Sequence, residues 1–330
     1  MLKKVLKKVL PDAVIEKGKK FIESRLVLND SFRDALKYKK YYNYNSVGDS
    51  STGIKELLIF HTHSLEKGLS HPNFRDNFGK GALTGIKENL IKFNESNLSK
   101  NSFEYQNAIS VLKYYKDLHE SKGIVTPFFD SLFDLNEIKS GNDIAGASKH
   151  TNDDPKKMDF DQLQQFRTSQ REFSKEPVDS NVFNKVVGMA LKTPSVCNRQ
   201  PWRAYVTDDQ EKIAELLELQ GGFTGYDLPP VLSLITVDNE AFIGSHERNE
   251  PYIDGGLFLM NYVFSLTYYG LASCILNTML IEDKKAKVKK ILDVSSSESL
   301  IGFVAAGYPK DDLTIANSAR KPVDEVLKIR

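Results

Sequence analysis

The distribution of strand-forming sequence most constrains the fold, because all of it lies in the second half of the chain. Short runs rich in branched and aromatic residues recur there, each separated from the next by helical spacing of apolar residues. The expected strands are Trp202 to Val206, Val231 to Val237, Ser273 to Leu276 and Leu300 to Ala306. The expected helices are Asn181 to Lys192, Glu211 to Leu219, Gly255 to Tyr269 and Lys284 to Leu292. This alternation predicts an α/β or α+β sandwich around one sheet.

The first part of the chain predicts helices instead. Apolar residues recur at spacings of three and four from Ile54 to Leu65 and from Leu98 to Leu118, and nothing there alternates like a strand for long. The stretch 137–159 is polar, rich in Gly, Ser and Asn, and without an apolar period, which predicts a linker. We therefore expect a helical N-terminal extension (1–136), a linker (137–159) and a second domain (160–330).

Composition excludes several classes of function. The formal net charge of +1 gives no global field that would attract nucleic acid. Cys197 and Cys274 provide neither a disulfide framework nor zinc spacing, which favours a reducing cytoplasm. The longest apolar run, Gly255 to Leu266, is too short to span a bilayer and predicts a helix that is buried on all sides.

The N-terminus is amphipathic. Apolar residues recur at helical spacing within residues 1–10, and four lysines fall largely on the other face. One interpretation is a short basic helix that docks on the body or frays. The other is a weak, reversible contact with an anionic membrane surface, which would make a cytoplasmic protein peripheral at the inner face.

Two segments carry polar groups suited to a bound ligand. In FRTSQREF, Arg167 and Arg171 are four apart and would share one face of a helical turn, with Thr168 and Ser169 between them. They offer charge-assisted donors to an anion, although a solvated basic helix start has the same pattern. In TPSVCNRQPW, two prolines bracket an irregular loop. That loop could present amide groups to a flat polar ring, or be a polar surface turn.

Two later segments give weaker signals. Small residues in Gly270 to Asn277 would let backbone approach a ligand closely, although a tight turn alone would also explain them. The strand end at Gly307 is followed by a polar stretch that contains Arg320 and Lys321, which is also typical of a solvated basic tail.

In this order and at these separations, the four segments resemble the nitroreductase family of FMN enzymes. The resemblance rests on an R-x-S-x-R-x-F motif, a P-S-x-x-N-x-Q-P-W loop, a G-L-x-S turn after a long apolar helix, and a G-Y-P strand end with a later basic residue. The matching residues are Arg167, Ser169, Arg171, Phe173, Pro194, Ser195, Asn198, Gln200, Pro201, Trp202, Gly270, Leu271, Ser273, Gly307, Tyr308, Pro309 and Arg320. The resemblance covers about half of the chain.

The resemblance implies an α+β FMN-binding fold, with a mainly antiparallel sheet flanked by helices and a helical N-terminal region. It implies an intertwined homodimer with FMN at the interface, in which Pro194 and Ser195 typically come from the partner subunit. Arg167, Ser169 and Arg320 would hold the phosphate. The implied cofactor-binding residues are Arg167, Thr168, Ser169, Arg171, Pro194, Ser195, Asn198, Gln200, Ser273, Cys274, Leu276, Gly307 and Arg320.

The implied activity is hydride transfer from NADH or NADPH through flavin N5 to a second small molecule, with ping-pong kinetics and no catalytic side chain. Two alternatives stay open: a flavin-dependent tailoring enzyme acting on a sugar or lipid-linked intermediate of surface-polysaccharide biosynthesis, and a flavin-binding subunit without turnover.

The segment around His61 poses a separate question. His61, His63, Glu66 and His71 suggest metal ligands, but no His-x-x-x-His pair occurs there, so we expect no metal. The segment also resembles an H-x-x-E-K-G-L region found ahead of nitroreductase-like proteins from bacterial surface-polysaccharide gene sets. Its role could be a lid over the flavin, part of a substrate pocket, or structural support.

Overall fold

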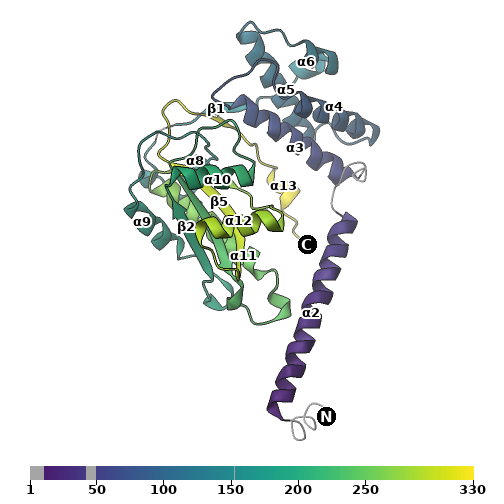
Figure 1. The fold of residues 1–330 in the computed structure, drawn as a ribbon. Coiled ribbons are helices and arrows are strands. Elements are labelled where there is room, and N and C mark those ends of the chain that lie inside the picture. Colours follow the sequence, from purple (N-terminus) through teal and green to yellow (C-terminus); the bar gives the residue numbers. More distant parts are fainter. Residues whose placement is uncertain (1–10, 42–49, 152) are drawn as a thin grey trace. The chain divides into compact units, whose positions relative to one another are not determined.

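A computed structural model describes residues 11–41, 50–151 and 153–330 (Figure 1). Its contacts divide the chain into two compact units. The sheet unit contains residues 11–41 and 154–309, and the helical unit contains residues 50–151, 153 and 310–330. The basic segment 1–10, for which a membrane contact is predicted, lies outside the described residues.

A four-stranded antiparallel sheet in the order β2-β3-β5-β4 forms the centre of the sheet unit. Its strands are β2 (Trp202–Thr207), β3 (Val231–Asp238), β4 (Ala272–Leu276) and β5 (Glu298–Gly307). The two central strands pair Val231 with Ala306 and Leu234 with Phe303. The predicted α+β class with a mainly antiparallel sheet is confirmed.

Helices cover both faces of this sheet (Figure 1). On one face, α9 (Asn181–Ala190) and α11 (Glu250–Tyr268) share a core with Val231, Ile235 and Val304. On the other, α10 (Gln210–Gln220) and α12 (Glu282–Leu292) share a core with Leu232, Leu234 and Phe303. Successive strand residues point to opposite faces, so the continuous buried run of β3 supplies both cores.

The remaining elements of the sheet unit are short, apart from α2 (Asp12–Tyr41), a helix of 30 residues. The α8 helix (Phe160–Phe166) begins at a capping box, in which Asp159 and Gln162 bond each other's backbone nitrogen. Four single turns complete the unit: η2 (Pro155–Lys157), η3 (Val196–Asn198), η4 (Asn239–Ala241) and η5 (Ser245–Glu247).

The helical unit packs its helices around an aromatic core that includes Phe93, Tyr115 and Phe129. Its helices are α3 (Ser51–Leu69), α4 (Lys80–Glu95), α5 (Phe103–Ser121), α6 (Pro127–Leu132), α7 (Leu135–Lys139) and α13 (Val323–Val326). A two-stranded sheet joins β1 (Ala147–Lys149) to β6 (Thr314–Ala316), which brings the end of the chain into this unit.

Three features differ from the expectations. The segment 137–159, predicted as a linker, contains β1, and Ala145 and Ala147 belong to the core of the helical unit. Contacts group residues 310–330 with the helical unit, whereas the predicted second domain runs to residue 330. The α11 helix is not buried on all sides, because Ile253, Leu257 and Met260 are between 40% and 54% exposed. The predicted domain boundaries stay predictions.

Candidate functional site

The R-x-S-x-R segment is extended rather than helical. The α8 helix ends at Phe166, and Arg167 already has an extended backbone (φ −65°, ψ 113°). The prediction that the two arginines share a helical turn is therefore wrong. Ser169 forms a parallel bridge with Ser273, and the Gln170 backbone nitrogen donates to the Ser273 carbonyl at 2.9 Å. Extended residues alternate sides, so the exposed Ser169 and the half-buried Arg171 lie opposite the buried Gln170.

The far end of the same segment lies against the end of β5. Phe173 bridges Pro309, and the Ser174 nitrogen donates to the Tyr308 carbonyl at 2.9 Å. A Cβ at Gly307 would lie 2.9 Å from the Phe173 Cβ and 2.8 Å from the Pro230 Cγ. Glycine is therefore required for the close approach of this segment, which explains why Gly307 belongs to the pattern.

The β4 strand positions three residues that the resemblance assigned to the cofactor. Ser273, Cys274 and Leu276 are all at least 94% buried, and the last two belong to the core beneath α10 and α12. The Cys274 and Leu276 side chains therefore face that core, which leaves the β4 backbone as the part that could cover a ring. These cofactor contacts stay predictions.

The predicted loop between α9 and β2 holds an unusual backbone. Cys197, Asn198 and Gln200 have φ of 49°, 54° and 51°, in the left-handed region that non-glycine residues rarely occupy. Such strain persists only where surrounding contacts enforce it, and it is common at ligand sites. Within the loop, Ser195 Oγ accepts from the Gln200 nitrogen at 2.9 Å, and Gln200 Nε2 donates to Asn198 Oδ1 at 3.2 Å.

Two carboxylates outside the loop hold it in place. The Val196 nitrogen donates to the Asp254 carboxylate at 3.2 Å, and burial raises the pKa of that carboxyl. Arg199 forms a two-point ion pair with Glu247, and its hydrogen bond holds the pKa of Glu247 at about 2. The sequence gives no local signal for either contact, because about 50 residues separate the partners.

The two parts of the predicted site lie at opposite edges of the sheet. The Arg167 to Phe173 segment follows β4, which is one edge strand, whereas the strained loop leads directly into β2, which is the other. Three strand spacings of about 4.8 Å separate these edges. One copy of the chain therefore brings Ser169, Ser273 and Gly307 together on the β4 side of the sheet and does not bring Asn198 or Gln200 to them.

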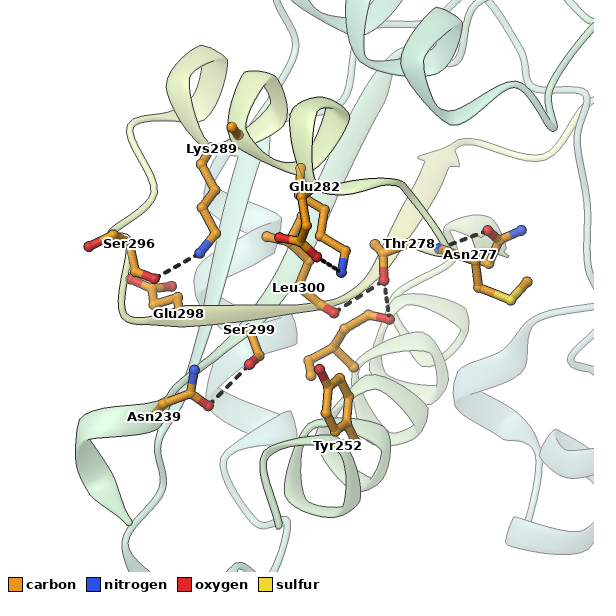
Figure 2. A pocket seen from close by; sticks show the side chains of 14 residues that line it. Asn239, Tyr252, Asn277, Thr278, Glu282, Lys289, Ser296, Glu298, Ser299 and Leu300 are labelled. Atoms are coloured by element: carbon orange, nitrogen blue, oxygen red, sulfur yellow. Dashed lines mark hydrogen bonds and ion pairs between the residues drawn. The ribbon is translucent and has the colours of Figure 1, made fainter. Parts of the chain in front are cut away.

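A pocket of about 630 Å³ opens beside the end of β4, and its lining includes Asn239, Thr278, Lys289 and Glu298 (Figure 2). The lining groups bond one another: Lys289 Nζ donates to the Ser296 carbonyl at 3.0 Å, and Thr278 Oγ1 donates to the Leu300 carbonyl at 3.1 Å. These bonds stabilise the wall, and none of the predicted cofactor-binding residues lines the pocket.

Arg320 belongs to the helical unit, where its guanidinium donates to the Ser318 carbonyl. The adjacent Lys321 forms an ion pair with Glu56 at 2.5 Å and lies 3.6 Å from the buried Glu104. The last segment of the chain is thus attached to α3 and α5. The predicted contact of Arg320 with a phosphate stays a prediction.

The H-x-x-E-K-G-L residues support the helical unit. The Glu66 carboxylate is buried and accepts from the Gly146 nitrogen at 3.0 Å, while its other oxygen lies 3.2 Å from His63 Nδ1. A Cβ at Gly68 would lie 2.1 Å from the Phe78 ring, so this helix position packs directly on an aromatic side chain. These contacts favour structural support over a lid.

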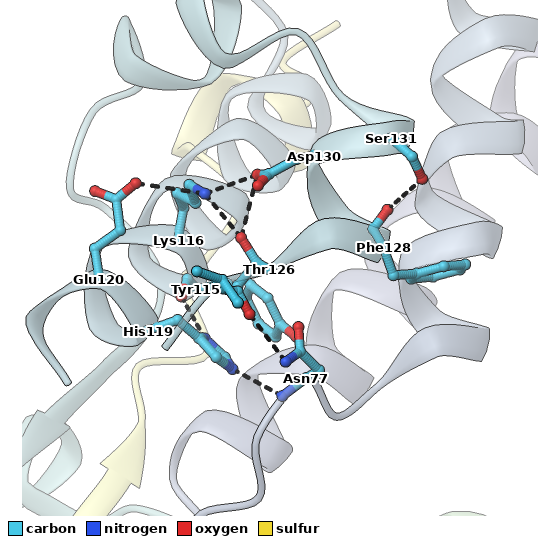
Figure 3. Close-up of polar contacts among 10 residues, drawn as sticks. Asn77, Tyr115, Lys116, His119, Glu120, Thr126, Phe128, Asp130 and Ser131 are labelled. Atoms are coloured by element: carbon cyan, nitrogen blue, oxygen red, sulfur yellow. Dashed lines mark hydrogen bonds and ion pairs between the residues drawn. The ribbon is translucent and has the colours of Figure 1, made fainter. Parts of the chain in front are cut away.

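Three more histidines of the helical unit have different surroundings. Burial lowers the pKa of His61, and His71 Nδ1 accepts from the Asn73 nitrogen at 3.1 Å. His119 is fully buried, with Nδ1 2.7 Å from the Tyr115 carbonyl and Nε2 accepting from the Asn77 nitrogen at 3.3 Å (Figure 3). Within the part of the chain that the structure describes, no three His, Cys, Asp or Glu residues are arranged to hold a metal ion.

The sheet unit is the part of the chain that is similar to known proteins. Residues 165–224 and 226–308 match the profile of the Nitroreductase family. The sheet unit contains a nitroreductase-family domain. The match covers both the R-x-S-x-R segment and the strained loop.

Curated relatives cover the same part of the chain. A putative NADH dehydrogenase/NAD(P)H nitroreductase of Archaeoglobus fulgidus is 24% identical over 147 residues, which is 44% of this chain and 83% of the relative. The NADH dehydrogenase of Thermus thermophilus is 26% identical over 177 residues, which cover 44% of this chain and 84% of the relative. Iodotyrosine deiodinase 1 of Sus scrofa is 24% identical over 203 residues, which cover 52% of this chain and 68% of the relative.

Solved structures align with the nitroreductase-family domain as well. A nitroreductase family protein of Streptococcus pneumoniae has 23% identity and a TM-score of 0.46, covering 52% of this chain and all of that one. A putative nitroreductase of Desulfovibrio desulfuricans in complex with FMN has 22% identity and a TM-score of 0.44, covering 51% and 95%.

Proposed function

We propose that this protein is an FMN-dependent oxidoreductase that uses NADH or NADPH and works as a homodimer. Each flavin site would take the R-x-S-x-R segment and β4 from one copy and the strained loop from the other. The opposite-edge placement of these two parts carries the proposal, because a site that needs both cannot be completed within one sheet.

The uncovered face of α11 supports the same arrangement. Ile253, Leu257 and Met260 are spaced by four and three residues, so they form one apolar stripe on that helix. Exposed apolar stripes of this kind usually mark an interface. A second copy packed on this stripe would remove it from water, as the predicted dimer requires.

The donor groups of the two segments fit FMN. Ser169 is exposed, and Arg167 and Arg171 are half-buried on the same extended segment, so this segment carries a hydroxyl and guanidinium groups of the kind that bind a phosphate or a flavin oxygen. Asn198 and Gln200 are exposed at the tip of a loop that four separate contacts hold in a strained conformation. The loop is therefore already fixed before a ligand arrives, which reduces the ordering cost of binding.

The side chains would bind and orient, and no side-chain nucleophile is required. Bound FMN would supply the hydride chemistry, taking reducing equivalents from the nicotinamide and giving them to a small-molecule acceptor. Arg167 and Ser169 would anchor the phosphate, and Asn198 of the second copy would bond a polar ring edge. Arg171 would place a positive charge near the ring, which favours a negatively charged reduced cofactor.

The first experiment is the visible spectrum of the purified full chain, with the released chromophore identified by mass. We expect a flavin spectrum, FMN near one per chain, and bleaching on anaerobic addition of NADH or NADPH. A colourless protein that does not take up added FMN would overturn the proposal. A flavin that binds but is not reduced by either nicotinamide would overturn the assigned donor.

The shared site has its own test. Arg167→Ala and Asn198→Ala copies would each be impaired alone when FMN is limiting. Co-assembled copies would regain about one quarter of wild-type activity, because half of randomly formed dimers carry one intact site of two. Sites contained within single chains would give no recovery in the same mixture.

A further inference from the structure

The long helix α2 separates its charges by face. Its acidic residues from position 16 onward are Glu16, Glu23, Asp30 and Asp34, which are spaced by seven, seven and four residues. Residues at these spacings lie along one side of a helix. The α2 helix therefore has an acidic face.

This acidic face docks on the sheet unit. Arg248 donates to the Asp34 carboxylate through Nε at 3.0 Å and Nη2 at 2.6 Å, and it lies 3.9 Å from Asp30. The Ser245 backbone nitrogen donates to Glu23 at 3.2 Å. These contacts come from one segment at η5, so they fix which side of α2 faces inward, and the opposite side faces away.

That opposite side is apolar. Val14, Phe21 and Leu28 are spaced by seven residues, and Phe32 and Leu36 follow at intervals of four. Each of these five residues lies two positions away from an acidic residue along the chain. A shift of two positions turns a helix by about 200°, which places this stripe opposite the acidic face. Phe21, Leu28 and Phe32 are 64%, 69% and 64% exposed. We call these five residues the α2 stripe.

Positively charged side chains lie on the same side of the helix as the α2 stripe, and none of the acidic residues from Glu16 onward does. Lys17, Arg25 and Lys39 fall within about 60° of its centre by helical spacing, and the Arg25 guanidinium lies 5.8 Å from the centre of the Phe21 ring. Arg33 and Lys40 flank it at about 80–100°. The acidic residues from Glu16 onward all lie on the docked side, so the outward side is both apolar and positive.

We propose that the α2 stripe binds an anionic membrane surface, with the helix lying in the plane of the headgroups. Apolar residues flanked by Lys and Arg are the pattern that suits this position, because the apolar side enters the acyl boundary while the cations meet lipid phosphates. Pairing of two α2 stripes would instead bring Arg25 and Lys39 of both copies together without a counter-charge, which is unfavourable. None of the described helices carries an apolar stretch that could cross a membrane.

The test is sedimentation of the full chain with vesicles of phosphatidylglycerol and phosphatidylcholine, compared with vesicles of phosphatidylcholine alone. We expect binding to the anionic vesicles only, weakened by salt. Leu28→Glu or Phe32→Glu would lower partitioning at least about tenfold, since each removes a large apolar group that would enter the acyl boundary and adds a repelled charge.

Ser31→Glu is the matched control, because it adds the same charge to the same helix about 90° from the stripe. We expect it to lower partitioning less than about fivefold. An equal loss in Ser31→Glu and Leu28→Glu, or unchanged binding in both stripe variants, would overturn the proposal. A fall in solution mass caused by Leu28→Glu, without vesicle binding by the wild type, would assign the stripe to a second copy instead. Unchanged helical circular dichroism would show that the variants remain folded.

Discussion

Arg199 and Glu247 form a two-point ion pair, with Nη2 2.6 Å from Oε1 and Nη1 3.0 Å from Oε2. Their side chains are only 19% and 11% exposed, and the same arginine donates to the Ala241 carbonyl at 2.7 Å. The pair joins the strained loop to η5, and η5 in turn holds α2. One short turn therefore fixes two segments that lie far apart in the sequence.

The Arg199–Glu247 pair predicts a loss of stability in acid. The folded-state pKa of Glu247 is about 2, below the ordinary 4.5, so the pair stabilises the fold fully above about pH 4.5 and progressively less as the pH falls toward 2. The difference in unfolding free energy between wild type and Glu247→Gln should shrink from about pH 5 to about pH 3, as measured by urea unfolding. A difference that does not change with pH would contradict this origin.

Replacing Arg167 by Ala should weaken FMN affinity at least about tenfold, because a charge-assisted bond of about 1.5–3 kcal/mol would be lost. Fluorescence titration of apoprotein with FMN measures the change. Arg203→Ala is the control, since Arg203 lies on the other edge strand and bonds the Trp202 carbonyl. Equal retention of FMN by both variants would remove Arg167 from the phosphate site.

A methyl group at position 307 should separate the R-x-S-x-R segment from β5. Gly307→Ala should cost about 1–3 kcal/mol, because the added Cβ meets two fixed side chains. Gly188→Ala provides the opposite control: nothing lies within 4 Å of its Cβ position in α9, so it should stabilise by about 0.5–1 kcal/mol. Thermal unfolding measures the stability of both variants. An equal change in stability for Gly307→Ala and Gly188→Ala would mean that Phe173 moves aside freely.

Glu66→Ala should destabilise the helical unit by about 1–3 kcal/mol, because the buried Gly146 nitrogen would lose its hydrogen bond to the carboxylate. His63→Ala removes the other partner of the carboxylate. Because the His63 side chain is 44% exposed, this change should cost less than about 1 kcal/mol. Denaturant unfolding followed by circular dichroism measures both. A flavin-dependent rate that changes while stability does not would instead support a role at the active site.

The strands and helices of the sheet unit could be predicted closely, because their apolar periods are strong. The predicted strand Val231 to Val237 extends only one residue further, and the helix predicted from Gly255 begins at Glu250 because Pro251 suits a first turn. The region 1–136 was predicted as helical, but α2 and α4 were not identified as individual helices. In α2 the apolar side faces away from the protein, so it gives no signal of a core helix. In α4 the buried Leu83, Ile86, Leu90 and Phe93 do recur at helical spacing, but the glycines beside them obscured that period.

The candidate site could be predicted as a set of segments but not as a geometry. The motif order identified Ser169, Ser273 and Gly307, and the structure brings these together. The helical conformation expected for Arg167 and Arg171 was wrong, since a spacing of four puts residues on one side of an extended segment as well as of a helix. Asp254 and Glu247 could not be found, because only the fold brings distant carboxylates to the loop.

The opposite-edge placement of the two site segments has a consequence for how the protein behaves when it is scarce. If half of every site belongs to another copy, activity per chain is set by the association equilibrium as well as by the chemistry. Dilution below the dissociation constant of the dimer would then switch the protein off while each chain remains folded. Expression level would thus act as a threshold on flux, with no effector and no modification involved.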